Sequence, residues 1–154
     1  MTIVATLCYL LRGGNVLLIK KKRGFGAGKY NGVGGKVERG ETIEEAAKRE
    51  IMEEVGVEAL ELEYAGVLKF YSTNREPDWI VHVYRCTKFR GEPKASDEGK
   101  PRWFSLDSIP YSEMWEDDKL WLEHVLKGGC VKGRFWFNSN YSKLLEWELD
   151  LESE

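Results

Sequence analysis

The sequence predicts an α+β fold in which helices pack around a central mixed β-sheet. The predicted elements follow the order strands, helix, strands, helix, strands, which is not the regular alternation of a doubly wound sheet. Hydrophobic residues make up 42% and charged residues 32% of the chain, so a packed core is feasible. The 154 residues suit one domain, and we expect residues 1–154 to form it.

Strand segments are expected in both halves of the chain. Four apolar, β-prone stretches come first, at residues 3–11, 15–20, 62–71 and 79–88. Gly13 and Gly14 form the expected turn between the first two of them. The second half predicts a short strand, a helix that ends before two glycines, and a closing hairpin. These elements are residues 102–106, residues 112–126 before Gly128-Gly129, and residues 131–138 with 144–151.

The clearest local pattern is a helix over residues 42–55. Thr42 and Glu45 have the spacing of a capping box, and Gly56 stops the helix. At about 100° per residue one apolar stripe forms from Ile43, Ala47, Ile51 and Val55. Three carboxylates follow an edge of that stripe: Glu50, Glu53 and Glu54. Helical spacing brings these carboxylates close together.

The acidic edge has two readings from chemistry alone. The ordinary reading is a solvated acidic face, and the other reading is a site for a divalent metal. A glycine-dense loop before the helix favours the other, because glycines let the backbone approach a ligand closely; the loop holds Gly32, Gly34, Gly35 and Gly40. Carboxylate oxygens suit Mg²⁺ or Mn²⁺, and such a metal suits a phosphate-bearing substrate.

Composition excludes several other classes. The net charge of -3 argues against a nucleic-acid polymer as partner, because phosphate binding needs clustered positive charge. No apolar run reaches the roughly 18 residues that cross a membrane, and residues 1–11 lack the features of a secretory signal. Cys8, Cys86 and Cys130 form no CxxC pair, so a reducing, cytoplasmic location is expected.

A sequence motif over residues 35–57 sharpens the metal hypothesis. Gly35, Glu41 and the run that begins at Arg49 have the spacing GX5EX7REUXEEXGU, with U aliphatic, and this resembles the Nudix box. Nudix enzymes hydrolyse nucleoside diphosphates linked to another group. The resemblance implies an α/β/α sandwich and a Mg²⁺ site, with Mn²⁺ as a substitute. It implies these metal ligands: the Gly35 backbone, Glu50, Glu53, Glu54 and Glu98. Arg49 would orient the glutamates.

A wider resemblance covers nearly the whole chain. Residues 21–28, 31–32, 34–37, 96–98, 114–115, 117–118 and 133–137 are similar to the MutT-like branch that acts on oxidised purine nucleoside triphosphates. In that branch the base lies in an aromatic pocket. By resemblance, Asn31 would hydrogen-bond the purine, Trp115 would stack on it, and Asp117 and Asp118 would face its polar edge. The remaining lining would be Thr6, Lys21, Phe25 and Phe70.

The paired aspartates also have a plain reading. Asp117 and Asp118 could be an ordinary pair at a helix start, where the helix dipole favours negative charge. In a partly dry pocket the pair would instead raise at least one pKa, so that one carboxyl stays protonated and donates a hydrogen bond. The neighbouring Met114-Trp115 match favours the second reading.

These observations together predict a Mg²⁺-dependent hydrolase that releases a nucleoside monophosphate and pyrophosphate. The general base is open among Glu53, Glu54 and Glu98, because that choice needs geometry. Tyr30, Val33 and Trp79 depart from the MutT-like pattern, so another substrate such as ADP-ribose, a dinucleoside polyphosphate or a normal dNTP is an alternative. A non-catalytic nucleotide-binding protein is the other alternative. Both a monomer and a homodimer are compatible with the sequence.

Overall fold

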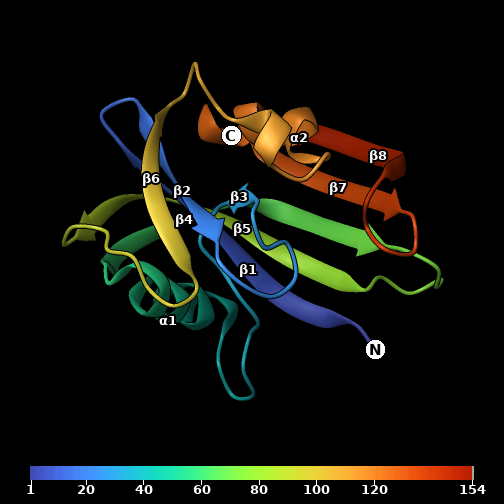
Figure 1. Cartoon of the computed structure of the whole chain (residues 1–154), viewed down its shortest axis with the longest axis horizontal. Coiled ribbons are helices and arrows are strands. Elements are labelled where there is room, and N and C mark those ends of the chain that lie inside the picture. The colour runs from blue at the N-terminus through green and yellow to red at the C-terminus, as the bar shows by residue number, and fades with distance from the viewer. Residues whose placement is uncertain (154) are drawn as a thin grey trace.

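The computed structural model describes residues 1–153, which build one eight-stranded sheet and two α-helices (Figure 1). The strands are β1 (Ile3–Arg12), β2 (Asn15–Lys21), β3 (Tyr30–Asn31), β4 (Glu58–Tyr71), β5 (Trp79–Arg90), β6 (Gly99–Ser105), β7 (Cys130–Phe137) and β8 (Leu144–Glu152). The helices are α1 (Ile43–Val55), the 3-10 turn η1 (Tyr111–Glu113) and α2 (Asp118–Leu126). None of the helices is both long enough and apolar enough to cross a membrane within these described residues.

The sheet is mixed, as predicted. Its strands follow the order β3-β2-β1-β5-β4-β7-β8, and β6 pairs with β2. The β1–β5 and β4–β7 pairs are parallel, whereas the other pairs are antiparallel. The antiparallel β4–β5 pair joins the two parallel pairs, so that β1, β5, β4 and β7 lie side by side. Segments far apart in the chain therefore share the centre of the sheet.

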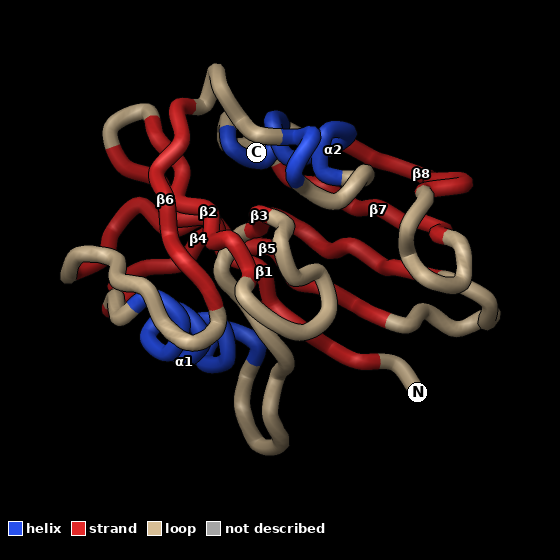
Figure 2. The backbone as a smooth tube through the Cα atoms, viewed as in Figure 1, coloured by secondary structure: helices blue, strands red, loops and turns tan. Residues whose placement is uncertain are grey.

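The two helices cover opposite faces of the sheet. Side chains alternate along β1: Leu7 and Tyr9 belong to the core under α2, whereas Cys8 and Leu10 belong to the core under α1. Figure 2 shows the helices on either side of the strands. The α/β/α sandwich expected from the sequence is confirmed, and both cores are formed by the same central strands.

Helix α1 has the boundaries that its sequence predicts. The Thr42 side chain accepts from the Glu45 N–H at 3.1 Å, and the Glu45 carboxylate accepts from the Thr42 N–H at 2.8 Å. Gly56 ends the helix with φ 69°, a left-handed conformation that favours glycine. The apolar stripe lies against the sheet, with Ile51 and Val55 fully covered. The caps and the stripe together fix how α1 presents its acidic edge.

The helix expected over residues 112–126 is shorter in the structure, so that prediction is wrong in its first part. Tyr111–Glu113 forms a single 3-10 turn, Met114 is extended, and α2 begins only at Asp118. Met114 is 4% exposed and packs into the core under α2. The break has a physical reason: an extended residue buries the Met114 side chain and releases Trp115 toward the pocket described below.

Candidate active site

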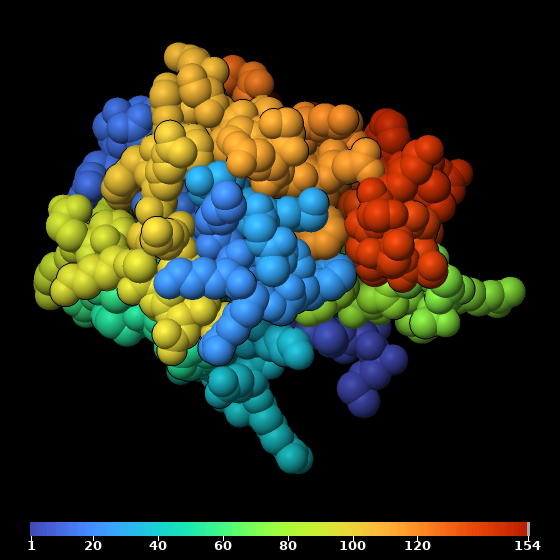
Figure 3. Space-filling view, viewed as in Figure 1, coloured from blue at the N-terminus to red at the C-terminus, as the bar shows by residue number. Residues whose placement is uncertain are grey.

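A pocket of about 780 Å³ opens beside strands β1, β2 and β3 and helix α1. All of the predicted site residues except Arg49 line it: Thr6, Lys21, Phe25, Asn31, Gly35, Glu50, Glu53, Glu54, Phe70, Glu98, Trp115, Asp117 and Asp118. Figure 3 shows the segment around residues 21–30, in light blue, at the surface between the yellow and orange parts of the chain. The pocket thus draws on loops and strands from both halves of the sequence.

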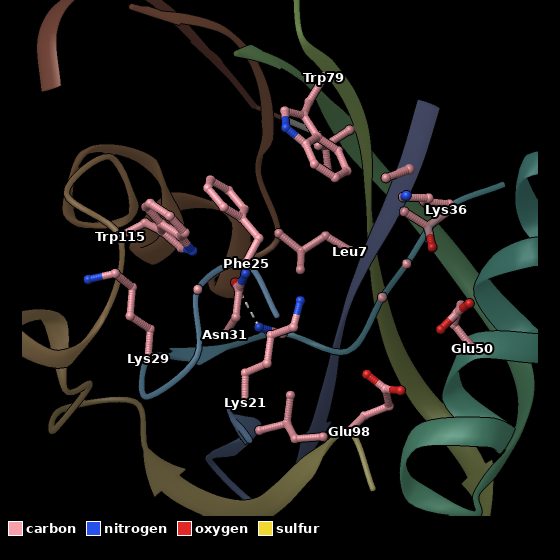
Figure 4. Close-up of a pocket in the computed structure, with 18 of the residues that line it drawn as sticks. Leu7, Lys21, Phe25, Lys29, Asn31, Lys36, Glu50, Trp79, Glu98 and Trp115 are labelled. Carbon is pink, nitrogen blue, oxygen red and sulfur yellow. Dashed lines mark hydrogen bonds between the residues drawn. The ribbon is translucent and has the colours of Figure 1, made fainter. Parts of the chain in front are cut away.

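The pocket has an acidic end and an aromatic end. Figure 4 shows Glu50 on the helix side, with Trp115 at the opposite side and Phe25 between Trp115 and Trp79. Lys21 lies between the two ends in this view. A ligand that filled the pocket would therefore meet carboxylates at one end and flat rings at the other.

Arg49 organises the acidic end from behind. Its guanidinium donates twice to Glu41, from Nε at 2.6 Å and from Nη2 at 2.9 Å. It also donates from Nη1 to Glu50 at 2.7 Å and to Glu53 at 3.1 Å, and from Nη2 to the Lys36 carbonyl at 3.0 Å. One cation in this fork arrangement fixes the orientation of three carboxylates. An orienting role for Arg49 would use these contacts, and that role stays a prediction.

Glu54 is the most unusual carboxyl group at this end. Its side chain is 7% exposed on the α1 face that packs toward β1. Desolvation, the hydrogen bond with Glu50, and the charges of Glu50 and Glu98 raise the pKa of Glu54 to about 9, and Lys21 opposes that shift. The carboxylates around Glu54 thus outweigh the one cation that acts on it, Lys21. A divalent ion among these groups would favour its ionised form.

The residues present fit a divalent metal by their chemistry, although the ligands are not gathered in advance. Within residues 1–153 no three acidic, histidine or cysteine side chains stand at metal-binding spacing. Glu50 and Glu53 are held instead by Arg49. Gly35 lies against this group: a Cβ at Gly35 would come 2.5 Å from the Glu50 carboxyl carbon. The Gly35 carbonyl accepts from the Thr6 N–H at 2.9 Å, and a carbonyl oxygen has a second lone pair.

The aromatic end is a stack of rings. Phe25 lies parallel to Trp79, with centroids 6.2 Å apart and planes 12° apart, and it stacks on Trp115 at 5.0 Å and 30°. The Lys29 ammonium lies 5.2 Å from the Trp115 ring centroid. Phe25 and Trp115 are in contact, so a purine can stack on that side of Trp115 only when Phe25 moves. Gly24 and Gly26 beside Phe25 both have positive φ, which gives this loop a conformation that other residues rarely adopt.

Asp117 and Asp118 lie buried at the bottom of the aromatic end. Their exposed fractions are 2% and 3%. Burial raises the pKa of Asp117 to about 6, while a hydrogen bond from the Trp121 indole N–H at 2.8 Å lowers it. Burial and the Asp117 charge raise the pKa of Asp118 well above its usual range.

Asp117 and Asp118 lie at the start of α2, as the plain helix-start reading expects, but their contacts point to a role in the pocket as well. Asp117 occupies the N-cap position of α2, yet its side chain makes no capping hydrogen bond. The Asp118 Oδ2 atom is buried with no partner among the residues that the structure describes. A buried oxygen without a partner is costly unless a ligand supplies one. A protonated Asp118 can donate a hydrogen bond to such a ligand, and Asp117 can accept one.

Asn31 and Thr6 add two more polar groups to the pocket. The Asn31 amide oxygen accepts from the Gly32 N–H at 2.9 Å, drawn as a dashed line in Figure 4. This contact leaves the Asn31 NH₂ group available as a donor. The Thr6 hydroxyl is buried and unpartnered in the described chain. Phe70 supplies an apolar wall and stacks on Phe135 at 5.5 Å.

Several pocket residues have no assigned role in the sequence argument. Trp121 holds Asp117, and the helical i, i+4 spacing of the two residues was a signal for that contact. Trp79, which departs from the MutT-like pattern, also lines the pocket. Tyr141 and Lys29 also line it. No motif marks these last two, because they reach the pocket from loops.

Comparisons with known proteins agree with this arrangement. A family model described as the NUDIX domain matches residues 1–125. Two relatives are named oxidized purine nucleoside triphosphate hydrolase. The one from Danio rerio is 46% identical over 94% of this chain and 92% of its own length. The one from Mus musculus is 42% identical over 86% of this chain and 85% of its own length. A solved MutT structure from Bacillus halodurans has a TM-score of 0.85 and 31% identity, covering 96% of this chain and 97% of that one.

Proposed function

Because this chain belongs to the Nudix hydrolase family, we propose that it hydrolyses oxidised purine nucleoside triphosphates to the nucleoside monophosphate and pyrophosphate. The substrates would be of the 8-oxo-dGTP and 2-hydroxy-dATP type, and the reaction would remove damaged nucleotides from the pool used for DNA synthesis. The names of the two vertebrate relatives support this choice, since both cover most of the chain.

One observation carries the substrate proposal. The buried pair Asp117 and Asp118 lies at the aromatic end of a pocket whose other end is acidic. Their raised pKa values allow one carboxyl to donate and one to accept a hydrogen bond. A pair that can shift its proton can match two purines whose hydrogen-bonding edges differ, such as 8-oxoguanine and 2-hydroxyadenine.

Nudix hydrolases generally need a divalent metal, and we propose Mg²⁺ here, with Mn²⁺ as a substitute. The ligands would be the Gly35 carbonyl and four carboxylates: Glu50, Glu53, Glu54 and Glu98. When bound, the metal neutralises phosphate charge and lowers the pKa of the attacking water. Hard oxygen donors of this kind suit Mg²⁺.

The chain's own groups have separate tasks in this reaction. Arg49 keeps Glu50 and Glu53 oriented through its hydrogen bonds. Lys21 lowers the pKa of Glu54 by its charge and stands between the two ends, where it can contact the phosphates. Glu53, Glu54 and Glu98 are the carboxylates that can take the proton of the attacking water.

A substrate panel tests the proposal. Purified protein with Mg²⁺ is incubated with 8-oxo-dGTP, 2-hydroxy-dATP, dGTP and ADP-ribose, and the products are separated. We expect the oxidised nucleotides to react fastest and to give the monophosphate and pyrophosphate. Faster turnover of ADP-ribose or dGTP would assign the enzyme to another substrate, and no Mg²⁺-dependent turnover would favour a binding protein.

Asp117→Asn tests the base-reading role on the same panel. An amide cannot shift a proton, so we expect the ratio of 8-oxo-dGTP to dGTP turnover to fall by about tenfold. Asp107→Asn changes an exposed aspartate outside the pocket and serves as the matched control. An unchanged ratio in Asp117→Asn would remove the base-reading role.

We further propose that residues 1–154 act as one hydrolase domain. The family match ends at residue 125, but β7 pairs with β4 in the same sheet, and β8 pairs with β7. A cytoplasmic location is also proposed, because Cys8, Cys86 and Cys130 are all free thiols. Under this proposal the chain acts as a monomer or a homodimer.

A further inference from the structure

Tyr141 lies at the outer end of the aromatic pocket, in the turn of residues 138–143 between β7 and β8. Its ring meets Phe25 edge-on, with centroids 5.5 Å apart and planes at 89°. It meets Trp115 in the same way at 6.4 Å and 87°, and it stacks on Phe137 at 5.0 Å. Tyr141 therefore touches the two rings that face the proposed base site.

The backbone of Tyr141 is held in an uncommon conformation. Its φ of 58° lies in the left-handed region, and it is the one non-glycine residue there among residues 1–153. Bulky side chains rarely adopt this conformation, and it persists only where other contacts compensate for the strain. Such residues concentrate at ligand-binding sites. Other contacts of Tyr141 must therefore compensate for its strained backbone and hold its ring in place.

The hydroxyl of Tyr141 supplies one compensating contact. It donates to Asp78 Oδ2 at 2.6 Å, and the Ser72 hydroxyl donates to the same oxygen at 2.5 Å. Burial and the Asp78 carboxylate raise the pKa of Tyr141, so its hydroxyl stays protonated and keeps donating. Asp78 directly precedes Trp79, whose ring faces Phe25. The hydrogen bond thus ties the β7–β8 turn to the residue beside Trp79.

We propose that Tyr141, held by Asp78, is a further substrate-binding residue that closes the outer end of the base pocket. The inference rests on the proposed function, in which this end receives a purine. Edge-to-face contacts with Tyr141 limit how far the rings of Phe25 and Trp115 can move, and the hydrogen bond to Asp78 ties Tyr141 to the residue beside Trp79. Tyr141 therefore determines how much room the flat ring of a substrate finds among these walls.

Kinetics and binding with two Tyr141 variants test this inference. Tyr141→Phe keeps the ring and removes the hydrogen bond, and Tyr141→Ala removes both. We expect KM for 8-oxo-dGTP to rise about threefold in the first and about tenfold in the second, with kcat within about twofold of the wild type. The Kd of the product 8-oxo-dGMP, measured by calorimetry without metal, should rise by the same factors.

Tyr64→Phe is the matched control. Tyr64 is an exposed tyrosine outside the pocket, and its hydroxyl also bonds to a side chain, that of His82, at 2.8 Å. We expect its KM and Kd to equal those of the wild type. If Tyr141→Ala does not fold, Tyr141→Leu, which keeps most of the bulk, is compared with Tyr141→Phe.

Three results would overturn the inference. Unchanged KM and Kd in folded Tyr141 variants, with an active wild type, would overturn it alone and leave the proposed function intact. A fall in kcat with no change in KM or Kd would also overturn it, because that pattern indicates a role other than binding. A wild type that neither binds nor hydrolyses oxidised nucleotides would overturn the proposed function, and this inference with it.

Discussion

Two sets of carboxyl groups in one pocket have raised pKa values, but the neighbours that add to the effect of burial differ. Glu54 and Asp118 are both buried and both have a raised pKa. Around Glu54 the causes after burial are other carboxylates, which a metal can neutralise. Around Asp118 the main causes are burial and Asp117, with aromatic rings nearby instead of metal ligands. The same chemical group, a carboxyl, can therefore serve a cation at one end and a neutral base at the other.

Glu54→Gln is expected to lower kcat by about 10²-fold or more, while nucleotide binding persists. Glutamine has the same shape but cannot become a charged ligand or accept the proton of water. Steady-state kinetics with 8-oxo-dGTP and calorimetry with 8-oxo-dGMP check both parts. Glu61→Gln, at an exposed salt bridge with Lys88, is the control and should be fully active. Turnover like that of the wild type in Glu54→Gln would remove Glu54 from the mechanism.

Asp118→Asn is expected to make stability less dependent on pH. An unfolded aspartate has a pKa of about 3.9, whereas the folded Asp118 has a higher one. Between about pH 3.9 and the folded pKa, folding therefore binds a proton. The stability due to this group is full below about pH 3.9 and falls as pH rises through the folded pKa. An asparagine side chain does not titrate in this range, so the variant does not lose this stability as the pH rises.

Thermal unfolding of Asp118→Asn and the wild type across about pH 5 to 8 measures this effect. The Tm of the variant minus that of the wild type should grow as the pH rises. Asp107→Asn, at an exposed position, should show a constant difference. A difference for Asp118→Asn that shrinks with rising pH would mean that Asp118 is ionised in the folded protein.

At the scale of elements, the glycine loop before α1 and the helix itself act together. The caps at Thr42 and Gly56 set the helix boundaries, and the apolar stripe sets its rotation. Gly35 then lies directly against the Glu50 carboxylate, with no space for a side chain. The acidic end therefore depends on a close backbone approach as much as on the carboxylates.

Gly35→Ala is expected to displace the Glu50 carboxylate, because the new Cβ would lie 2.5 Å from its carboxyl carbon. Displacement by about 1 Å can cost about 10²-fold in rate, and the Mg²⁺ concentration for half-maximal activity should rise. Gly40→Ala is the control from the same loop: its φ of 87° adds strain, but its Cβ meets open space. That variant should lose stability and keep the metal dependence. The same metal dependence in both variants would contradict the role of Gly35.

At the scale of the whole molecule, the pocket joins segments that the sheet brings together. β1 supplies Thr6, α1 supplies Glu50 and Glu54, and the start of α2 supplies Asp118. Because β1 and β5 are parallel neighbours at the centre of the sheet, both helices lie within reach of the same strands. Ligand binding should therefore stabilise the whole fold.

The two ends of the pocket should differ in their need for metal. We expect 8-oxo-dGMP to raise the Tm with or without Mg²⁺, because the aromatic end carries most of its contacts. Pyrophosphate should raise the Tm only with Mg²⁺, since it meets carboxylates at the other end. At a ligand concentration of 100 times Kd the stabilisation is about 2.7 kcal/mol, which thermal unfolding resolves. An absolute metal requirement for 8-oxo-dGMP would contradict this division.

The sequence by itself determined what depends on local spacing. The capping box of α1, its apolar stripe and its acidic edge all follow from residues three or four apart, and the structure has them where the pattern predicts. The order of strands and helices also predicted the mixed sandwich. The helix that local spacing predicts over residues 112–126 is wrong in its first part. Met114 is buried by residues distant in the sequence, and its extended backbone interrupts the expected helix.

Only the tertiary structure decided how the pocket residues contact one another and which further residues join them. It placed Tyr141 against Phe25 and tied it to Asp78, across 116 and 63 positions in the chain. It also showed that Phe25 covers Trp115 and that Asp118 has an unpartnered oxygen. Contacts of this kind depend on strand pairing and loop conformation, which no local pattern encodes. The motif therefore indicated the chemistry, and the packing of loops over the sheet set the walls of the site where that chemistry is proposed.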